Sequence, residues 1–391
     1  MPEAVIVDAV RTPIGRAMKG SLAPLRPDET LAYVIDQVLE RNPGVDPRGV
    51  EEVIAGCGQP QGLQANNIAR IAVLLSDKLG QETAGSTISR YCSSGLDAIR
   101  AAANHVAVGQ GDIYVAAGVE FVSSYNGAQE ATRPEDQHDR LKGGDGRPDA
   151  FITMGLTAEN VAERYGITRE EQDALALRSH QRASRAIASG RAREEIAPVV
   201  IPQRTGDPVV VDTDEHPRPD TSLEKLAALR PVFRPHGTVT AGNSSGINDG
   251  AAAVLLTSAD AAERLGLHPL ARVVASAVAG VDPAYMGLGP IPATRKVLER
   301  TGLRIEDFDV IELNEAFAAQ VIPCVRELGI PMEKLNPNGG AIALGHPIGF
   351  SGARLVTTLV HELRLRQGRY GLATMCIGVG QGIAIVLERV A

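Results

Sequence analysis

The chain of 391 residues has no tryptophan, and only 3% of its residues are aromatic. Its hydrophobic cores must therefore be packed mainly with Ala, Val, Leu and Ile. The net charge is −8 and no run of Lys and Arg occurs, which argues against a nucleic-acid-binding protein. A stretch of about 20 apolar residues is also missing, so we expect no membrane-spanning helix.

Cysteine is scarce too. The four cysteines lie far apart and none forms a C-x-x-C pair: Cys57, Cys92, Cys324 and Cys376. This spacing argues against a zinc site, so we expect no bound metal, and it gives no sign of a disulfide framework. The first residues lack the basic and long apolar segments of a signal peptide. The predicted compartment is therefore the cytoplasm.

Apolar and helical segments alternate along much of the chain. Residues 5–10 and 53–56 have the pattern of short strands, while residues 29–39 and 67–79 have helical periodicity. This alternation is typical of α/β layer folds. Because single cores stop growing at roughly 250–300 residues, we expect two or three structural units.

The middle of the sequence differs from the rest. Residues 123–239 contain charged segments rich in Pro and Gly, interrupted by helical patterns at 157–165 and 169–189. Such a segment is typical of an insertion that covers an α/β body, and loops of this kind often recognise the substrate.

An internal repeat is the most informative pattern. In the first half, Cys92 comes just before a predicted helix at 96–108, and in the second half His346 comes just before a predicted helix at 353–365. A predicted strand follows each helix. Two such halves facing each other would bring Cys92 and His346 to one centre.

Cys92 is the best candidate nucleophile. It lies at a predicted helix start between small residues, where the helix dipole favours the thiolate, and Arg90 is close in sequence. The alternative is an inert buried cysteine. His346 lies in a glycine-rich loop and Pro347 fixes the backbone after it. Taken alone it could be a turn or surface histidine, but a nucleophilic cysteine needs a base, and His346 is the best-placed candidate.

Two further segments are candidates for the same site. Cys376 follows an apolar strand and begins a loop with glycines at alternate positions, whose backbone N–H groups could bind an oxyanion. A tight turn between two strands is the alternative. Asn314 follows the apolar run 310–313 and could equally be a helix cap.

Together these residues resemble the thiolase family. Four motifs occur in the order and context of thiolases: Cys92-Ser-Ser-Gly, Asn314-Glu-Ala-Phe, Gly345-His-Pro and Cys376-Ile-Gly-Val-Gly. The resemblance covers essentially the whole chain and includes the segments 154–161 and 240–246. Four motifs at matching spacing are far more specific than any one of them.

The resemblance implies an α/β fold with five layers, αβαβα, built from two related βαβαβαββ halves and an inserted loop domain. We assign residues 1–122 with 240–268 to the first half, 123–239 to the loop domain that covers the substrate, and 269–391 to the second half. Thiolases are dimers or tetramers, so a homodimer or homotetramer is expected.

The resemblance also implies a division of catalytic roles. Cys92 would take the acyl group while His346 accepts its proton, and Cys376 would exchange the α-proton of acetyl-CoA. One oxyanion hole would consist of His346 and a water held by Asn314, and the other of the backbone N–H groups of Cys92 and Gly378. Coenzyme A is then a substrate, and no tightly bound cofactor is expected.

Further positions match those that bind coenzyme A or the acyl chain. Ser245 matches the loop at the pantetheine arm, Ala241 lies in the same segment, and Arg218 matches a position near the nucleotide phosphates. Four others match residues that line the acyl or pantetheine tunnel: Met154, Phe233, Met286 and Phe317. The alternatives are a solvated surface charge for Arg218 and ordinary core packing for the four tunnel positions.

Other classes of protein fit less well. A decarboxylating ketosynthase works with two histidines, and here Cys376 stands where one of them would be. A non-catalytic CoA-binding protein would be expected to lose Cys92, His346 or Cys376. A cysteine hydrolase would leave the second cysteine and the paired glycine-rich loops without a purpose.

Two positions bear on the type of thiolase. Ser89 stands where many thiolases have Asn, which puts a supporting hydrogen bond in question. Thr153 precedes the Met154-Gly segment where many short-chain biosynthetic enzymes carry His. This favours a degradative enzyme that cleaves 3-ketoacyl-CoA with CoA to acetyl-CoA and a shortened acyl-CoA, in fatty acid or side-chain β-oxidation. An acetoacetyl-CoA-forming biosynthetic thiolase is the alternative.

Overall fold

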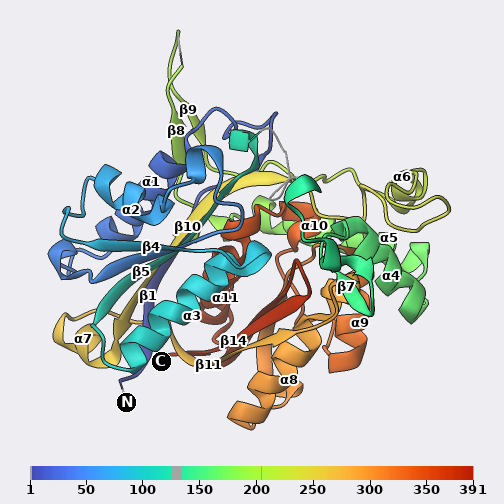
Figure 1. Ribbon diagram of the computed structural model, residues 1–391. Coiled ribbons are helices and arrows are strands. Elements are labelled where there is room, and N and C mark those ends of the chain that lie inside the picture. The colour runs from blue at the N-terminus through green and yellow to red at the C-terminus, as the bar shows by residue number, and fades with distance from the viewer. Residues whose placement is uncertain (1, 126–133, 204, 391) are drawn as a thin grey trace.

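The internal repeat of the sequence reappears in the sheet of the computed structural model, which describes residues 2–125, 134–203 and 205–390. Ten strands form one continuous sheet in the order β12-β13-β14-β11-β1-β10-β5-β3-β4, and β2 pairs with β10 (Figure 1). The strands are β1 (Ala4–Arg11), β2 (Gly15–Arg16), β3 (Glu52–Cys57), β4 (Ala84–Ile88), β5 (Ile113–Phe121), β10 (Asn248–Ser258), β11 (Ala271–Gly280), β12 (Phe308–Leu313), β13 (Tyr370–Ile377) and β14 (Gln381–Arg389).

The two halves of this sheet have the same pairing scheme. In the first half β3 is parallel to β5, which is antiparallel to β10, which is antiparallel to β1. In the second half β12 is parallel to β13, which is antiparallel to β14, which is antiparallel to β11. The halves join where β1 pairs with β11. Each half therefore repeats one strand order, as the sequence predicts.

Helices cover both faces of each half. They are α1 (Pro27–Glu40), α2 (Ile68–Leu75), α3 (Ser94–Ala107), α7 (Ala259–Arg264), α8 (Pro290–Thr301), α9 (Ala318–Leu328), α10 (Ala341–Leu344) and α11 (Ile348–Arg366). The helix predicted at 67–79 ends earlier than expected, because α2 stops at Leu75. The other predicted helices and strands are confirmed with small shifts of their ends.

Three separate cores define five layers. The middle core packs α3 and α11 against one face of each half-sheet, through residues such as Leu96, Leu359 and Met375. A second core packs α1 and α2 on the outer face of the first half, and a third packs α8 and α9 on the outer face of the second. Since successive strand residues point to opposite faces, Leu372 faces the third core while Ala373 faces the middle core. The predicted αβαβα order is confirmed.

The predicted inserted unit contains α4 (Met154–Tyr165), α5 (Arg169–Ala188), α6 (Leu223–Ala227) and two small hairpins, β6 (Lys142–Gly144) with β7 (Arg147–Asp149) and β8 (Val199–Ile201) with β9 (Val209–Val211). Residues 126–133 and 204 of this unit lie outside the described residues. A buried cluster attaches the unit to β1: Arg11 forms ion pairs with Glu195 (2.8 Å) and Asp214 (2.7 Å). In Figure 1, α4 and α5 lie beside α9 and α10 of the second half. The domain boundaries themselves stay a prediction.

No helix in the described parts of the chain combines the length and the apolar character that crossing a membrane requires.

Candidate active site

Cys92 and His346 occupy equivalent places in the two halves. Cys92 lies in a short 3-10 turn (Tyr91–Ser93), two residues before α3 begins at Ser94. His346 likewise lies two residues before α11 begins at Ile348. The repeat seen in the sequence therefore holds at the level of single residues.

Glycines bring these two turns together. A Cβ atom on Gly95 would lie 2.6 Å from the carbonyl oxygen of Gly349 and 2.9 Å from the backbone nitrogen of Ala353. Gly95 and Gly349 each come three residues after the candidate catalytic residue of their half. Because real Cβ atoms do not approach backbone so closely, only glycine lets α3 and α11 start in contact. The Cys92 turn packs against both α11 and β13 as a result.

The backbone N–H of Gly378 lies near the thiol of Cys92 and favours its thiolate form. Burial nevertheless raises the pKa of Cys92 to about 11, and that N–H opposes the rise. The expectation that the helix start favours the thiolate is therefore wrong for the free protein, because desolvation outweighs it. Arg90 does not compensate, since its guanidinium pairs with Asp97 and donates to Gln381, at 2.8 Å each.

His346 is held as a neutral base. Its Nδ1 lies 2.6 Å from the hydroxyl oxygen of Ser351, which donates its own proton to the carbonyl of Pro347 at 2.6 Å. The hydroxyl has only one proton, so Nδ1 must be the donor and Nε2 carries the lone pair. Burial, followed by the nearby charge of Arg354, lowers the pKa of His346 to about 4. Its backbone N–H donates to Asn248 at 3.1 Å.

Asn314 lies against the reactive nitrogen of His346. Its Nδ2 is 3.4 Å from His346 Nε2, and its backbone N–H donates to the carbonyl of Thr374 on β13. The side chain is fully buried, and within the described residues its Oδ1 has no hydrogen-bond partner. Asn314 is not the cap of α9, because that helix begins at Ala318 and its N-cap is Phe317.

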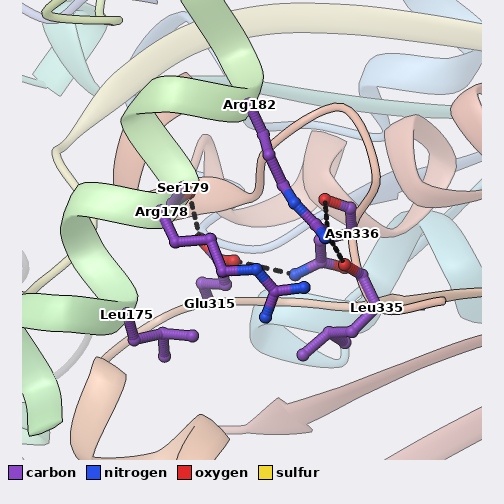
Figure 2. A pocket seen from close by; sticks show the side chains of 7 residues that line it. All are labelled: Leu175, Arg178, Ser179, Arg182, Glu315, Leu335 and Asn336. Atoms are coloured by element: carbon purple, nitrogen blue, oxygen red, sulfur yellow. Dashed lines mark hydrogen bonds between the residues drawn. The ribbon is translucent and has the colours of Figure 1, made fainter. Parts of the chain in front are cut away.

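The next residue, Glu315, lines a small pocket between α5 and the loop before α10. Its carboxylate accepts from Ser179 (2.6 Å), Asn336 (2.9 Å) and the backbone of Ile342 (3.3 Å). Figure 2 shows these side chains converging from α5 and from the second half. Ser179 also accepts from the N–H of Gly340, in the loop that leads to His346. The inserted unit is thus hydrogen-bonded to both the Asn314 and the His346 segments.

Cys376 is the next-to-last residue of β13 and is fully buried. The loop after it is a tight connection to β14, with Val379 (φ 62°) and Gly380 (φ 79°) in the left-handed region. The segment is therefore a strand-to-strand turn and at the same time presents the N–H of Gly378 to Cys92. Burial raises the pKa of Cys376 well above its usual value, and the nearby Cys92 adds to the rise.

The four predicted tunnel residues gather around Cys376. Met286 and Phe317 belong to the same apolar cluster as Cys376, and Met154 packs against that cluster. The rings of Phe233 and Phe317 meet edge to face, with centroids 6.2 Å apart. Each of these residues comes from a different segment of the chain, and α4 places Met154 at its first turn.

The residues predicted to bind coenzyme A are spread more widely. The N–H of Ser245 donates to the carbonyl of Ala316 at 2.9 Å, which places Ser245 beside the Asn314 motif. Ala241 is exposed in the same segment. Arg218 is exposed on the inserted unit, and its backbone N–H donates to His180 at 3.2 Å. In the described part of the chain there is no group of three or more side chains suited to hold a metal ion.

Sequence reasoning missed the side chains that orient the site, above all Ser351, Asn248 and Glu315. The signal for Ser351 was its place in the first turn of the helix after His346, on the side that returns toward the histidine. Asn248 and Glu315 depend on contacts between distant segments, at separations of 98 residues for Asn248–His346 and 136 for Glu315–Ser179. No local pattern encodes such pairs.

Comparisons with known proteins show which family the chain belongs to. The family model described as "Thiolase, N-terminal domain" matches residues 4–260, and "Thiolase, C-terminal domain" matches residues 267–389. A 3-oxoadipyl-CoA/3-oxo-5,6-dehydrosuberyl-CoA thiolase of Escherichia coli is 50% identical over the full length of both chains. A beta-ketoadipyl-CoA thiolase of Pseudomonas aeruginosa is 51% identical over 99% of each chain. The crystal structure of an acetyl-CoA acetyltransferase of Bacillus anthracis is 44% identical and superposes with a TM-score of 0.91, covering 100% of this chain and 99% of the other.

Proposed function

The chain belongs to the thiolase family, and from this premise we propose that it is a degradative thiolase whose preferred substrate is a 3-oxoacyl-CoA with a terminal carboxylate, such as 3-oxoadipyl-CoA. As a thiolase it is an acyltransferase that uses CoA thioesters. The substrate proposal rests on sequence identity. Over nearly the whole chain, 50% and 51% of residues are identical to those of thiolases named for that substrate.

In this proposal thiolysis proceeds in two steps. Cys92 attacks the 3-oxo carbon while its proton passes to Nε2 of His346, and the bond between carbons 2 and 3 breaks. Cys376 gives its proton to the departing enolate, which leaves as acetyl-CoA. The thiol of a second CoA then attacks the acyl group on Cys92 and gives its proton to the Cys376 thiolate, while His346 returns its proton to the departing sulfur of Cys92. All three residues thereby regain their starting protonation, and the proton left on acetyl-CoA is replaced by the one from CoA.

The resting charges of the site support this sequence. With the pKa of Cys92 raised to about 11 and that of His346 lowered to about 4, both side chains are neutral at pH 7. The thiol therefore loses its proton during the attack instead of beforehand, and the free nitrogen of His346 is the acceptor. A neutral pair also avoids an exposed thiolate that would react with other electrophiles.

Two groups of donors would stabilise the anions formed on the way. We assign the backbone N–H groups of Cys92 and Gly378 to the tetrahedral oxyanion, since both already lower the pKa of the thiol. One donor of this kind contributes about 3–4 kcal/mol. For the enolate we assign His346 together with a water held by Asn314, whose Oδ1 is buried without a partner among the described residues.

Substrate binding follows the same logic. We assign Ser245 and Ala241 to the pantetheine arm and Arg218 to the nucleotide phosphates, with the inserted domain 123–239 as the cover. The apolar cluster of Met154, Phe233, Met286 and Phe317 would surround the reacting end of the chain next to Cys376. No tightly bound cofactor is needed for these steps.

We also propose that the protein acts as a homodimer or homotetramer in the cytoplasm. β4 is an edge strand that pairs only with β3 in the described sheet, and Leu74 and Leu75 are exposed on the adjoining helix α2. An uncovered edge of this kind favours pairing with another chain. Light scattering coupled to size exclusion would give the number of subunits directly.

A second candidate is the formation or cleavage of acetoacetyl-CoA. It is favoured by the 44% identity to the acetyl-CoA acetyltransferase structure. Thr153, exposed just before α4, argues against it, because many short-chain biosynthetic thiolases carry His at this position.

The decisive experiment compares two substrates of equal chain length, 3-oxoadipyl-CoA and 3-oxohexanoyl-CoA, together with acetoacetyl-CoA. We expect 3-oxoadipyl-CoA to be cleaved to acetyl-CoA and succinyl-CoA with the highest kcat/KM. Equal rates for the two six-carbon substrates would refute the preference for a terminal carboxylate. Activity confined to acetoacetyl-CoA would establish the second candidate, and no cleavage of any substrate would refute thiolysis itself.

A further inference from the structure

A buried carboxylate outside the catalytic set lies beneath both reactive turns. Glu120, near the end of β5, is completely buried. Its Oε2 accepts from the backbone N–H groups of Gly58 (2.8 Å), Gln59 (3.3 Å) and Gly349 (2.8 Å). Its Oε1 accepts from the side chains of Gln64 and Tyr125. These five donors are all neutral, so this is not an ion pair.

One of these bonds leads to the His346 segment. Gly349 lies in the first turn of α11, three residues after His346 and two before Ser351, which orients the imidazole. The same carboxylate oxygen that holds Gly349 also holds Gly58, at the exit of β3 in the other half. Glu120 therefore connects the first turn of α11, the helix that follows His346, to the first half of the molecule by hydrogen bonds.

A second path leads to the Cys92 turn. The hydroxyl of Ser89, three residues before Cys92, donates to the carbonyl of Gly58 at 3.2 Å. Gly58 is thus held from both sides, by Glu120 through its N–H and by Ser89 through its carbonyl. In addition, the negative charge of Glu120 adds to the rise in the pKa of the Cys92 thiol, which is mainly due to burial.

Only a carboxylate satisfies this arrangement. Both carboxylate oxygens are hydrogen-bond acceptors, and every group around them is a donor. The amide of a glutamine would instead turn an NH₂ group toward other N–H groups. Burying such a group is costly: desolvation raises the pKa of Glu120 to about 7 in spite of the hydrogen bonds. A cost of this kind without an ion pair points to a role beyond simple packing.

We infer that Glu120 is a positioning residue for the reaction, whose carboxylate holds the Cys92 turn and the His346 helix at a fixed separation through Gly58 and Gly349. This inference rests on the proposed roles of Cys92 and His346. It also explains what Ser89 does in place of the Asn found in many thiolases, since Ser89 connects the nucleophile segment to this carboxylate.

The test is Glu120→Gln in the full-length protein, with Asp36→Asn as matched control. Asp36 also accepts from a hydroxyl and a backbone N–H, those of Ser76 and Asp77, but lies in the outer layer on α1. We expect Glu120→Gln to lower kcat about 10- to 100-fold with KM within threefold, because binding contacts are unchanged while the two turns are misplaced. The control should retain kcat within twofold.

A second readout does not depend on the substrate. Iodoacetamide should alkylate Cys92, the partly exposed cysteine, at least threefold faster at pH 8 in Glu120→Gln, because the nearby negative charge is gone. Slower turnover with a faster-reacting thiol is a combination that loss of packing alone does not produce. A variant with lowered melting temperature but unchanged kcat and alkylation rate would overturn the inference.

Should Glu120→Gln fail to fold, Ser89→Ala decides, because it removes one hydroxyl from an exposed residue and so leaves the core intact. A kcat lowered threefold or more supports the connection through Gly58, and a kcat equal to that of the wild type overturns it. These outcomes are separate from the proposed function, which fails only if the wild-type protein cleaves no 3-oxoacyl-CoA.

Discussion

The two halves of the molecule share one strand order and place one candidate catalytic residue at the same point, two residues before the central helix. The first half has a thiol there and the second an imidazole. Burial acts on both, but in opposite directions: it raises the pKa of Cys92 to about 11 and lowers that of His346 to about 4. The repeat supplies two equivalent positions, and the difference in side chain makes one a nucleophile and the other its base.

The largest expected effect comes from removing either member of this pair. We expect Cys92→Ala to lower kcat for thiolysis by about 10⁴-fold or more, because no other group can carry the acyl chain. His346→Ala should cost about 10²–10⁴-fold, the contribution of a positioned general base. Steady-state assays with 3-oxoacyl-CoA measure both, and mass spectrometry should detect acylated Cys92 only in proteins that keep the cysteine.

Cys324→Ala is the control for that pair. This cysteine is buried in the outer layer of α9 and lies outside the proposed site. The kcat of the Cys324→Ala protein should remain within about twofold of the wild-type value. A Cys92→Ala protein with more than a tenth of wild-type activity would contradict the assignment of the nucleophile.

The ionisation of His346 and that of Cys92 should lower the free energy of unfolding at opposite ends of the pH scale. Folded His346 binds its proton only near pH 4, whereas an unfolded histidine binds it near pH 6.5, so stability is lost as pH falls through this window. Folded Cys92 keeps its proton up to about pH 11 and the unfolded cysteine only to about 9, so stability is lost as pH rises through that window.

The pKa shifts of His346 and Cys92 each change the free energy of unfolding by about 3 kcal/mol at most. Denaturant unfolding from pH 4 to 11 measures both contributions. His346→Asn should reduce the slope on the acid side alone and Cys92→Ser that on the alkaline side alone; the other buried histidines and cysteines keep the rest of each slope. A His346→Asn protein with the same acid slope as the wild type would show that His346 is not buried in its neutral form.

The contact between the two central helices should be sensitive to one methyl group. Gly95→Ala would push a Cβ atom to within 2.6 Å of the Gly349 carbonyl, so we expect about 1–3 kcal/mol of destabilisation and a lowered kcat. Gly49→Ala is the matched control, because its Cβ would only reach ordinary contact with Ile113 at 3.6 Å. Denaturant melts compare the two, and equal stability of both variants would refute the close approach.

The smallest effect is expected for the group that orients the base. Ser351→Ala leaves His346 in place but removes the acceptor of its Nδ1 proton. We expect kcat to fall about 3- to 10-fold, the loss of about 1 kcal/mol that one hydrogen bond contributes. The first half has no counterpart of this bond to the thiol of Cys92, so an equal effect of Ser94→Ala would weaken the comparison. Initial rates at saturating substrate measure both variants.

Much of the fold could be predicted from local patterns. Apolar alternation located β1, β3 and β13, and helical periodicity located α1, α3 and α5, because those signals depend on residues a few positions apart. The predicted end of α2 was wrong, because the helix stops at Leu75. The next residue, Ser76, donates its hydroxyl to the carboxylate of Asp36 on α1. That contact joins two helices and has no local signature.

The sequence by itself determined the family, the repeat, and the candidate residues Cys92, His346, Cys376 and Asn314, because reactive side chains in glycine-rich motifs are a short-range signal. Only the tertiary structure decided their protonation states and their orientation. Burial reversed the pKa expected for Cys92, and partners distant in the sequence fixed the rest, as Asn248 does for the His346 backbone. Desolvation and long-range hydrogen bonds arise when layers pack, so no window of sequence contains them.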